Sequence, residues 1–282
     1  MMRATHGPGR AATLWTTGIM DRLPSVIDPA IVRIERPEAP DGRAWVLYMD
    51  DVSAHFLRKG SVVEAAESCR LLAALARMHE AFFEPDPTRQ PTPDLCSLED
   101  LLVLASPATV AREAGGDPFI GVLERGWSAF DELAPDDVRT EIHRILDDPR
   151  PLAAAMLVDG ATITHSDPHY GTIAPAPDRF YALDWGLAAW APPAVDVAWW
   201  VDQSANLLAS SREDALDAFR AAEGPRHSER TLELALLVEL GLAGWQAQGI
   251  MDAPSEDVRE RRRPDLDWWV ARARIGPAVR LD

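Results

Sequence analysis

Polar residues that could carry out chemistry gather between Thr164 and Trp199. His165, Asp167 and His169 alternate along a turn-rich stretch that follows a short β-branched run, and Asp184 ends a second such run. Two carboxylates at the ends of neighbouring strands can face one cleft, where one accepts a proton from a hydroxyl and the other binds a divalent cation. Mg²⁺ usually takes one or two carboxylates together with substrate phosphates, which is the requirement of phosphoryl transfer.

The same residues allow two other interpretations. His165, Asp167 and His169 offer two imidazoles and a carboxylate, as a Zn²⁺ or Fe²⁺ site of a hydrolase would. Pro168 and Gly171 instead favour a turn, in which these side chains only satisfy a local hydrogen-bond network. The spacing by itself leaves phosphoryl transfer, a metal-dependent hydrolase and a structural turn open.

Three linked motifs give the stretch a wider context. Residues 165–172 read H-S-D-P-H-Y-G-T, residues 182–185 read A-L-D-W, and residues 191–198 read A-P-P-A-V-D-V-A. In order and spacing they resemble the catalytic core of the aminoglycoside phosphotransferase and choline kinase-like superfamily, distant relatives of protein kinases. Upstream, WVLYMDDVS resembles the hinge strand of that family, and LLAALARMHEAF resembles its L-A-x-L-H helix. The resemblance therefore runs from about Ala44 to Gly276.

This resemblance implies a role for each residue of the catalytic loop. Asp167 would orient the acceptor hydroxyl and accept its proton, with His169 beside it as a further catalytic residue. His165 would brace the loop by hydrogen bonding. Asp196, in the helix that follows, would anchor the loop from below.

The resemblance also implies ATP and Mg²⁺ as cofactors. Asp184 would hold Mg²⁺ against the nucleotide phosphates, and backbone groups of Tyr48, Met49 and Asp50 would face adenine. The family places an asparagine as second metal ligand where this chain has Thr172. A threonine hydroxyl is a neutral, weaker ligand with shorter reach, so we expect weaker metal binding or a single-metal site.

Periodicity and turn residues predict the elements that position these groups. We expect helices over 11–23, 61–82, 117–133, 135–146, 194–206, 211–222, 228–248 and 256–273. We expect short strands over 31–35, 44–49, 161–165, 172–175 and 179–185, with the strand over 44–49 buried. The pattern predicts an α+β fold, and the resemblance implies a bilobal, protein kinase-like one.

The nucleotide-binding lobe is expected to be reduced. We assign residues 1–52 to a remnant N-lobe that ends in the hinge, and residues 53–282 to a helical C-lobe with the catalytic loop and the acceptor region. Little chain precedes the hinge strand, and Lys59, the single lysine, follows it, so the family's nucleotide lysine has no counterpart. Within this superfamily two functions fit: a phosphotransferase impaired by the reduced N-lobe and by Thr172, or an inactive pseudokinase that only binds.

A shortened sheet would leave an apolar edge uncovered. We expect partial exposure of Trp15, Ile19, Ile31 and Val32, and self-association through that edge.

Composition restricts the partners. With 47% hydrophobic and 26% charged residues the chain is globular, and 45 acidic against 28 basic residues give a net charge of −17. Such a charge repels nucleic acids and anionic lipids and favours a small, cationic hydroxyl acceptor. The apolar stretch over 232–245 contains Glu233 and Glu239 and is too short to span a membrane. Two cysteines without a CxxC motif fit a reducing, cytoplasmic setting.

Overall fold

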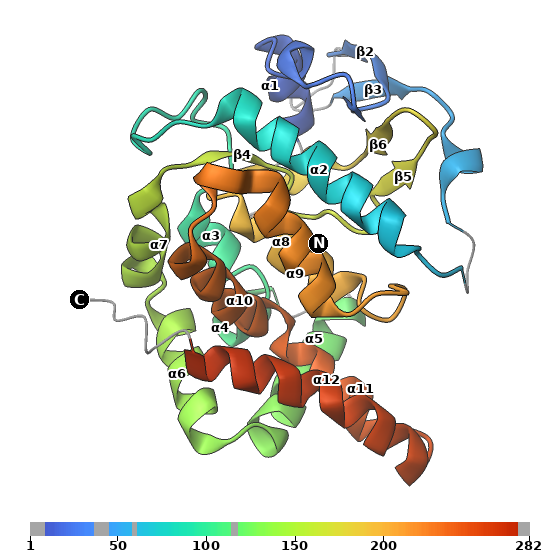
Figure 1. The fold of residues 1–282 in the computed structure, drawn as a ribbon. Coiled ribbons are helices and arrows are strands. Elements are labelled where there is room, and N and C mark those ends of the chain that lie inside the picture. Colours follow the sequence, from blue (N-terminus) through green and yellow to red (C-terminus); the bar gives the residue numbers. More distant parts are fainter. Residues whose placement is uncertain (1–8, 37–44, 58–60, 114–117, 276–282) are drawn as a thin grey trace. The chain divides into compact units, whose positions relative to one another are not determined.

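The computed structural model describes residues 9–36, 45–57, 61–113 and 118–275 (Figure 1). Two compact units emerge, and each combines separate stretches of chain. The strand-containing unit consists of His6–Cys96 with Gly160–His227, and the helical unit consists of Ser97–Asp159 with Ser228–Asp282. Lys59 and the predicted start of the second strand at Ala44 lie outside the described residues. The lobe boundary after residue 52 stays a prediction.

The strand-containing unit mixes helices with short strands. Its helices are α1 (Arg10–Thr16), α2 (Ala65–Phe82), α8 (Ala194–Gln203) and α9 (Arg212–Glu223), with the 3₁₀ turns η1 (Met20–Arg22), η2 (Ser53–His55), η4 (Trp185–Leu187) and η5 (Gly224–Arg226). Its strands are β1 (Ile27–Asp28), β2 (Ile31–Glu35), β3 (Val46–Met49), β4 (Thr162–Thr164), β5 (Ile173–Pro175), β6 (Phe180–Ala182) and β7 (Ala189–Ala191).

These strands form three small sheets. One has the order β1-β6-β5, with β1 parallel and β5 antiparallel to β6, and the others are the antiparallel pairs β2-β3 and β4-β7. All residues of β4 and β7 are buried, which suits their small and β-branched side chains. The loop between β4 and β5 therefore starts from a buried position, while the turn that contains Asp184 follows β6, whose Phe180 and Ala182 are buried.

Helix α2 is the main support of this unit. Its apolar residues recur at three- and four-residue steps, and Leu71, Leu75, Met78 and Phe82 are all buried. It packs against α9 and β4, and Figure 1 shows α9 running beside it. The backbone turns extended at Phe83, ahead of Pro85, as expected where a proline ends a helix.

The helical unit is built around α10 (Glu229–Ala243), which is buried from Thr231 to its end. The remaining helices are α3 (Leu98–Leu102), α4 (Pro107–Arg112), α5 (Pro118–Leu133), α6 (Asp136–Asp147), α7 (Arg150–Met156), α11 (Gln248–Met251) and α12 (Glu256–Ile275), with the 3₁₀ turns η3 (Leu157–Asp159) and η6 (Gly244–Ala247). Helix α10 contacts α3, α6, α7 and α12.

One stretch of this unit resembles a membrane span in length and composition alone. Residues Glu229–Met251 are long and apolar enough to cross a membrane, but 72% of their most apolar 18-residue stretch is buried inside the protein. A core helix has the same character.

The expected α+β class is confirmed, and most helices lie where periodicity places them. The expected burial of the strand over 44–49 is wrong: Val46, Tyr48 and Met49 are 39–42% exposed, because in the described part of the chain β3 pairs only with β2 and forms a sheet edge. The helix over 11–23 is interrupted after α1, where Gly18 takes a left-handed φ of 71°.

The expected apolar edge is only partly present. Ile19 and Ile31 are buried, because α1 packs on η1 and β2 pairs with β3, so their predicted exposure is wrong. Trp15 is half-buried, whereas Val32 is 58% exposed. Self-association through this edge stays a prediction.

Candidate functional site

The loop after β4 and the turn after β6 share an unusual backbone feature. Among the described residues, Ala30, Ser166 and Asp184 are the non-glycine residues with positive φ, and two of these three lie at the predicted site. Ser166 (φ 62°) directly precedes Asp167, and Asp184 (φ 57°) begins the η4 turn. Left-handed backbone is costly for residues with a Cβ atom and persists only where the surroundings hold it.

Asp196 holds the loop from the first turn of α8. Its Oδ1 accepts a hydrogen bond from the Ser166 amide (2.7 Å), and its Oδ2 accepts one from the His165 amide (3.1 Å). Its side chain is 1% exposed. These bonds fix the backbone just before Asp167, which is the geometry that the anchoring role requires.

His79 extends this anchor and was not predicted as a site residue. Its Nε2 lies 2.9 Å from Asp196 Oδ2, and its Nδ1 lies 2.6 Å from Glu223 Oε1 at the end of α9. Both ring nitrogens must donate, so the ring is an imidazolium. Burial acts to lower the pKa of His79, but the two carboxylates outweigh it and raise that pKa to about 9.

The buried charges continue to the surface. Glu223 Oε2 accepts from Arg226 Nε (3.4 Å), and Arg226 Nη1 lies 3.5 Å from Glu80 Oε1. The sequence signal for His79 is a histidine on the buried face of a helix, beside Met78 and Phe82. The sequence carries no signal that pairs it with Glu223.

Asp167 is held by His169. The His169 Nδ1 accepts a hydrogen bond from the Gly171 amide (2.9 Å), so the proton of the neutral ring is on Nε2, which lies 3.3 Å from Asp167 Oδ1. Burial, with a smaller contribution from His165, lowers the pKa of His169, and the Asp184 carboxylate opposes this. His169 is therefore neutral, with its Nε2–H beside Asp167 Oδ1.

The Thr172 hydroxyl closes the loop. It donates to the Asp167 carbonyl (2.5 Å) and accepts from the His169 amide (3.2 Å). The Thr172 carbonyl accepts from the Leu183 amide (2.8 Å), which ties the loop to the residue before Asp184.

His165 braces the two segments. Its Nε2 donates to the Leu183 carbonyl (2.8 Å), and its ring packs edge-on against Trp185 with centroids 4.9 Å apart. Burial lowers the pKa of His165, so the ring is neutral. Its buried Nδ1 has no hydrogen-bond partner in the described part of the chain.

The donor atoms at this site suit a hard cation. The carboxylates of Asp167 and Asp184 and the Thr172 hydroxyl offer oxygen, which Mg²⁺ prefers. The Nε2 of His165 and the Nδ1 of His169 already have hydrogen-bond partners. Within the described ranges no three His, Cys, Asp or Glu side chains form a metal cluster, and Mg²⁺ does not require one.

The predicted hinge residues lie at the end of β3. Tyr48 donates from its hydroxyl to Glu35 (2.9 Å) and packs under the Arg33 guanidinium. The Asp50 amide donates to the Ala30 carbonyl (2.9 Å). Met49 pairs with Ile31, and since β3 is a sheet edge, its outer backbone groups face away from β2. That outer edge is where backbone bonds to a base could form.

The hinge is connected to the rest of the site. The η2 turn that follows it contacts β5, and the His55 and Tyr181 rings pack at a tilt of 46° with centroids 5.2 Å apart.

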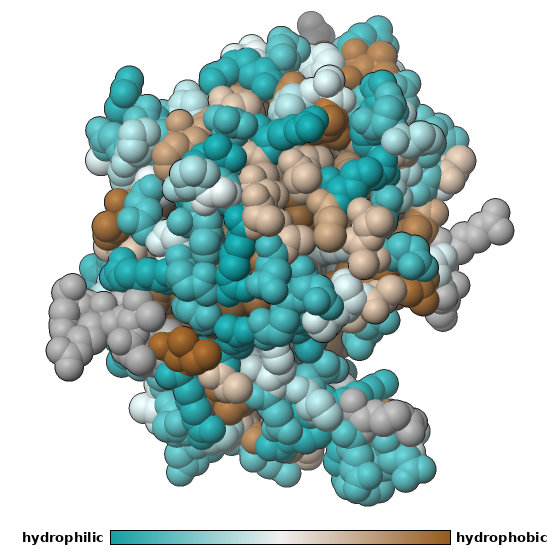
Figure 2. Space-filling view, viewed as in Figure 1, coloured by the Kyte–Doolittle hydropathy of each residue, from teal (hydrophilic) through white to brown (hydrophobic). Residues whose placement is uncertain are grey.

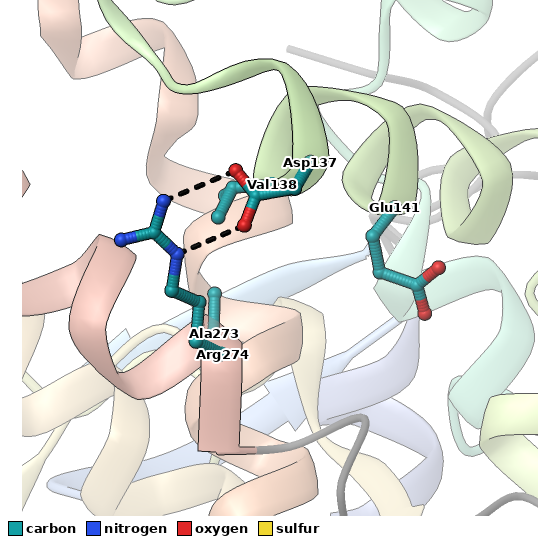
Figure 3. Close-up of a pocket in the computed structure, with 5 residues that line it drawn as sticks. All are labelled: Asp137, Val138, Glu141, Ala273 and Arg274. Carbon is teal, nitrogen blue, oxygen red and sulfur yellow. Dashed lines mark hydrogen bonds and ion pairs between the residues drawn. The ribbon is translucent and has the colours of Figure 1, made fainter.

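A hollow in the helical unit contains none of the predicted residues. It lies between α6 and α12, has a volume of about 300 Å³, and is lined by Asp137, Val138, Glu141, Ala273 and Arg274 (Figure 3). Asp137 and Arg274 form a two-bond ion pair (2.9 and 3.1 Å), and Glu141 pairs with Arg144. Each charged side chain that lines the hollow thus has an oppositely charged partner.

The fold of this chain is similar to that of several solved structures. The AMP-bound spectinomycin phosphotransferase APH(9)-Ia is 13% identical and aligns over 96% of this chain and 85% of its own, with a TM-score of 0.50. The chain has the fold of the aminoglycoside phosphotransferases. An aminoglycoside phosphotransferase from Alicyclobacillus acidocaldarius is 12% identical and aligns over 99% and 84% (TM-score 0.47). A choline kinase from Streptococcus pneumoniae is 11% identical and aligns over 93% and 80% (TM-score 0.43).

No protein-family model and no curated protein matches the sequence. The aminoglycoside phosphotransferase-like fold confirms the expected kinase-like architecture. Hydrogen bonds join the loop and the segment before Asp184 into one network, and the roles of the individual residues stay predictions. The residues of this network are His165, Asp167, His169, Thr172, Leu183 and Asp196.

Proposed function

We propose that this chain is an ATP-dependent phosphotransferase that phosphorylates a hydroxyl group of a small molecule. The observation that carries the proposal is the grip of Asp196 on the amides of His165 and Ser166. These two hydrogen bonds hold the left-handed backbone at Ser166, and Asp167 follows directly, near the turn that contains Asp184. Positioning and electrostatics supply most of the catalysis in phosphoryl transfer, so rigid carboxylates suit that reaction.

In the proposed reaction Asp167 accepts the proton of the acceptor hydroxyl. The hydroxyl oxygen forms a bond to the γ-phosphorus of ATP while the bond from that phosphorus to the β,γ-bridging oxygen breaks, and ADP leaves. His169 keeps one Asp167 oxygen oriented through its Nε2–H. The other oxygen is then left for the incoming hydroxyl.

The nucleotide would be held at two places. The outer edge of β3 at Tyr48–Asp50 offers backbone groups to adenine, and Asp184, with the weaker oxygen of Thr172, would hold Mg²⁺. When bound, Mg²⁺ neutralises phosphate charge. The bound AMP of the spectinomycin phosphotransferase that shares the fold supports a nucleotide here.

The acceptor is proposed to be small and cationic, and the reaction cytoplasmic. The net charge of −17 supports attraction of a cation and repulsion of nucleic acids and anionic membranes. Within the strand-containing unit, Trp199, Trp200 and Asp202 on α8 are candidates for acceptor contacts, although Trp200 is fully buried.

A second candidate function rests on Thr172. Its hydroxyl already donates and accepts within the loop, so it offers less to a metal than the family's asparagine would. The chain would then bind nucleotide without transferring phosphate, as a pseudokinase.

Calorimetric titration with MgATP tests both functions. We expect saturable binding that Asp184→Asn loses and that the exposed control Asp178→Asn keeps. Transfer of the γ-phosphate from labelled ATP to a panel of aminoglycosides and amino alcohols then separates the candidates. Transfer that Asp167→Asn abolishes supports the phosphotransferase, whereas binding without transfer supports the pseudokinase. Absence of binding at millimolar MgATP would exclude both.

A further inference from the structure

Arg10 is a buried charge far in sequence from the site it reaches. It is the first residue of α1 and is only 8% exposed. Its Nε donates to the Asp94 carbonyl (2.8 Å), and its Nη1 donates to the Gly186 carbonyl. A guanidinium is costly to bury, so such a position persists where its donors are well partnered.

Gly186 connects this contact to the Asp184 carboxylate. The Gly186 amide donates to Asp184 Oδ1 (3.3 Å), while the Gly186 carbonyl accepts from Arg10. One residue of the η4 turn is thus held on both sides. Since the left-handed backbone of Asp184 must be held by its surroundings, the Arg10 contact bears directly on where that carboxylate points.

The other partner of Arg10, the Asp94 carbonyl, belongs to a segment that is bonded to the residues after the η4 turn. The Cys96 amide donates to the Ala188 carbonyl (2.9 Å), and the Trp190 amide donates to the Cys96 carbonyl (3.2 Å). The segment around Asp94–Cys96 therefore runs beside the η4 turn. Arg10 spans the two segments with two separate donors, Nε and Nη1, of one planar group, whereas a lysine ammonium presents its donors from a single atom.

We propose that Arg10 is a positioning residue for Asp184 and sets the affinity of the site for Mg²⁺. This inference rests on the proposed function, in which Asp184 is the metal ligand. Outer partners that orient a ligand typically contribute about 10–100-fold in metal affinity. Arginine stays protonated at all ordinary pH values, so the contribution is independent of pH.

The test measures Mn²⁺ binding by electron paramagnetic resonance, in place of Mg²⁺ and in the presence of excess ADP. We expect Arg10→Met to weaken Mn²⁺ binding roughly tenfold and Arg10→Lys to weaken it less. Arg22→Met removes an exposed arginine of the same N-terminal segment and should bind Mn²⁺ like the unchanged chain. Asp184→Asn should abolish the binding.

Hydrogen exchange of the peptide over 183–188 provides a readout that needs no ligand. In folded Arg10→Met this peptide should exchange faster, while the peptide over 162–164 is unchanged. If Arg10→Met does not fold, Arg10→Lys is the variant compared. Unchanged exchange together with unchanged Mn²⁺ affinity would overturn the inference. If the unchanged chain binds neither ADP nor Mn²⁺, the proposed function fails, and the exchange result alone decides whether Arg10 positions the turn.

Discussion

Single residues decide the geometry of the loop through a row of buried charges. Asp196, His79 and Glu223 are each no more than 1% exposed, and they are joined by bonds of 2.9 and 2.6 Å. Each charge is tolerated in the interior because the next one compensates it. Removing one member leaves its neighbour uncompensated, which typically costs about 3–5 kcal/mol.

The protonation of His79 makes stability depend on pH. Its pKa of about 9 in the folded chain lies above its ordinary value of 6.5, so the folded state binds this proton more tightly. The stabilisation is fully present below pH 6.5 and is lost as the pH rises through about 9. Urea unfolding between pH 6 and 10 should show this loss, of the order of a few kcal/mol.

His79→Gln tests the origin of that pH dependence. The variant should be less stable at pH 7 and should lack the decline towards pH 9. His143→Gln, which removes a half-buried surface histidine paired with Asp131, serves as the control and should retain the decline. An identical pH profile in His79→Gln and the unchanged chain would contradict the assignment.

Gly171 leaves room for the His169 ring. A Cβ atom at this position would lie 2.5 Å from His169 Cε1 and 3.0 Å from Nδ1. Gly171→Ala should therefore displace the ring, break its contact with Asp167 and expose it. Because burial holds the pKa of His169 below its usual value, exposure should raise that pKa towards 6.5. Titration of the His169 ring by NMR checks this, and an unmoved pKa would refute it.

Much of the loop could be predicted from the sequence, because its residues are contiguous and form a motif. The left-handed backbone of Ser166 and the pairing of His79 with Glu223 could not. The first depends on tertiary hydrogen bonds to Asp196, and the second joins residues 144 positions apart.

At the level of elements, helix α5 packs closely against the η6 turn. A Cβ atom on Gly126 would lie 2.0 Å from the Trp245 carbonyl oxygen, whereas one on Gly121 meets only the end of the Arg125 side chain at 3.5 Å. Close backbone approach of this kind requires glycine at the contact.

The two glycines of α5 provide a matched pair of variants. Gly126→Ala should destabilise the chain by about 2 kcal/mol or more, because the backbone of η6 must shift. Gly121→Ala should stabilise it by up to about 1 kcal/mol, since alanine is the better helix former. Thermal unfolding of both variants is the measurement, and equal effects would show that α5 and η6 are not in close contact.

Long, periodic helices such as α2 and α5 were predictable from the sequence, and short elements were less so. The strands β1 and β7 contain two and three residues, too few for a period to show, and each forms through pairing with a distant strand. Helix α7 begins at Arg150, directly after Pro149, and no helix was expected over these residues. The exposure of β3 depends on how many strands its sheet has, which its own residues do not encode.

At the level of the whole molecule, acidic character dominates. The sequence has a net charge of −17, and the face shown in Figure 2 is mostly hydrophilic around a more apolar central area. A cationic acceptor would be attracted by this field, and salt screens such attraction over about 10 Å at 0.1 M.

Salt should therefore distinguish charged from neutral acceptors. The KM of a cationic acceptor should rise severalfold between 20 and 200 mM NaCl, whereas that of a neutral acceptor should hardly change. Steady-state assays with one acceptor of each kind are the measurement. A parallel rise for both would indicate that salt acts on the nucleotide site instead.

The strand-containing unit is built from two stretches that lie far apart in the sequence, and this has a consequence for synthesis on the ribosome. Helix α2 ends at Phe82, but its partner α9 begins only at Arg212. At translation rates of about 5–20 residues per second, the apolar face of α2 waits on the order of ten seconds for that partner. For most of this interval His79 lacks the carboxylates of Asp196 and Glu223, and Arg10 lacks the Gly186 carbonyl. The nascent strand-containing unit is therefore expected to depend on chaperones until the residues up to His227 have emerged.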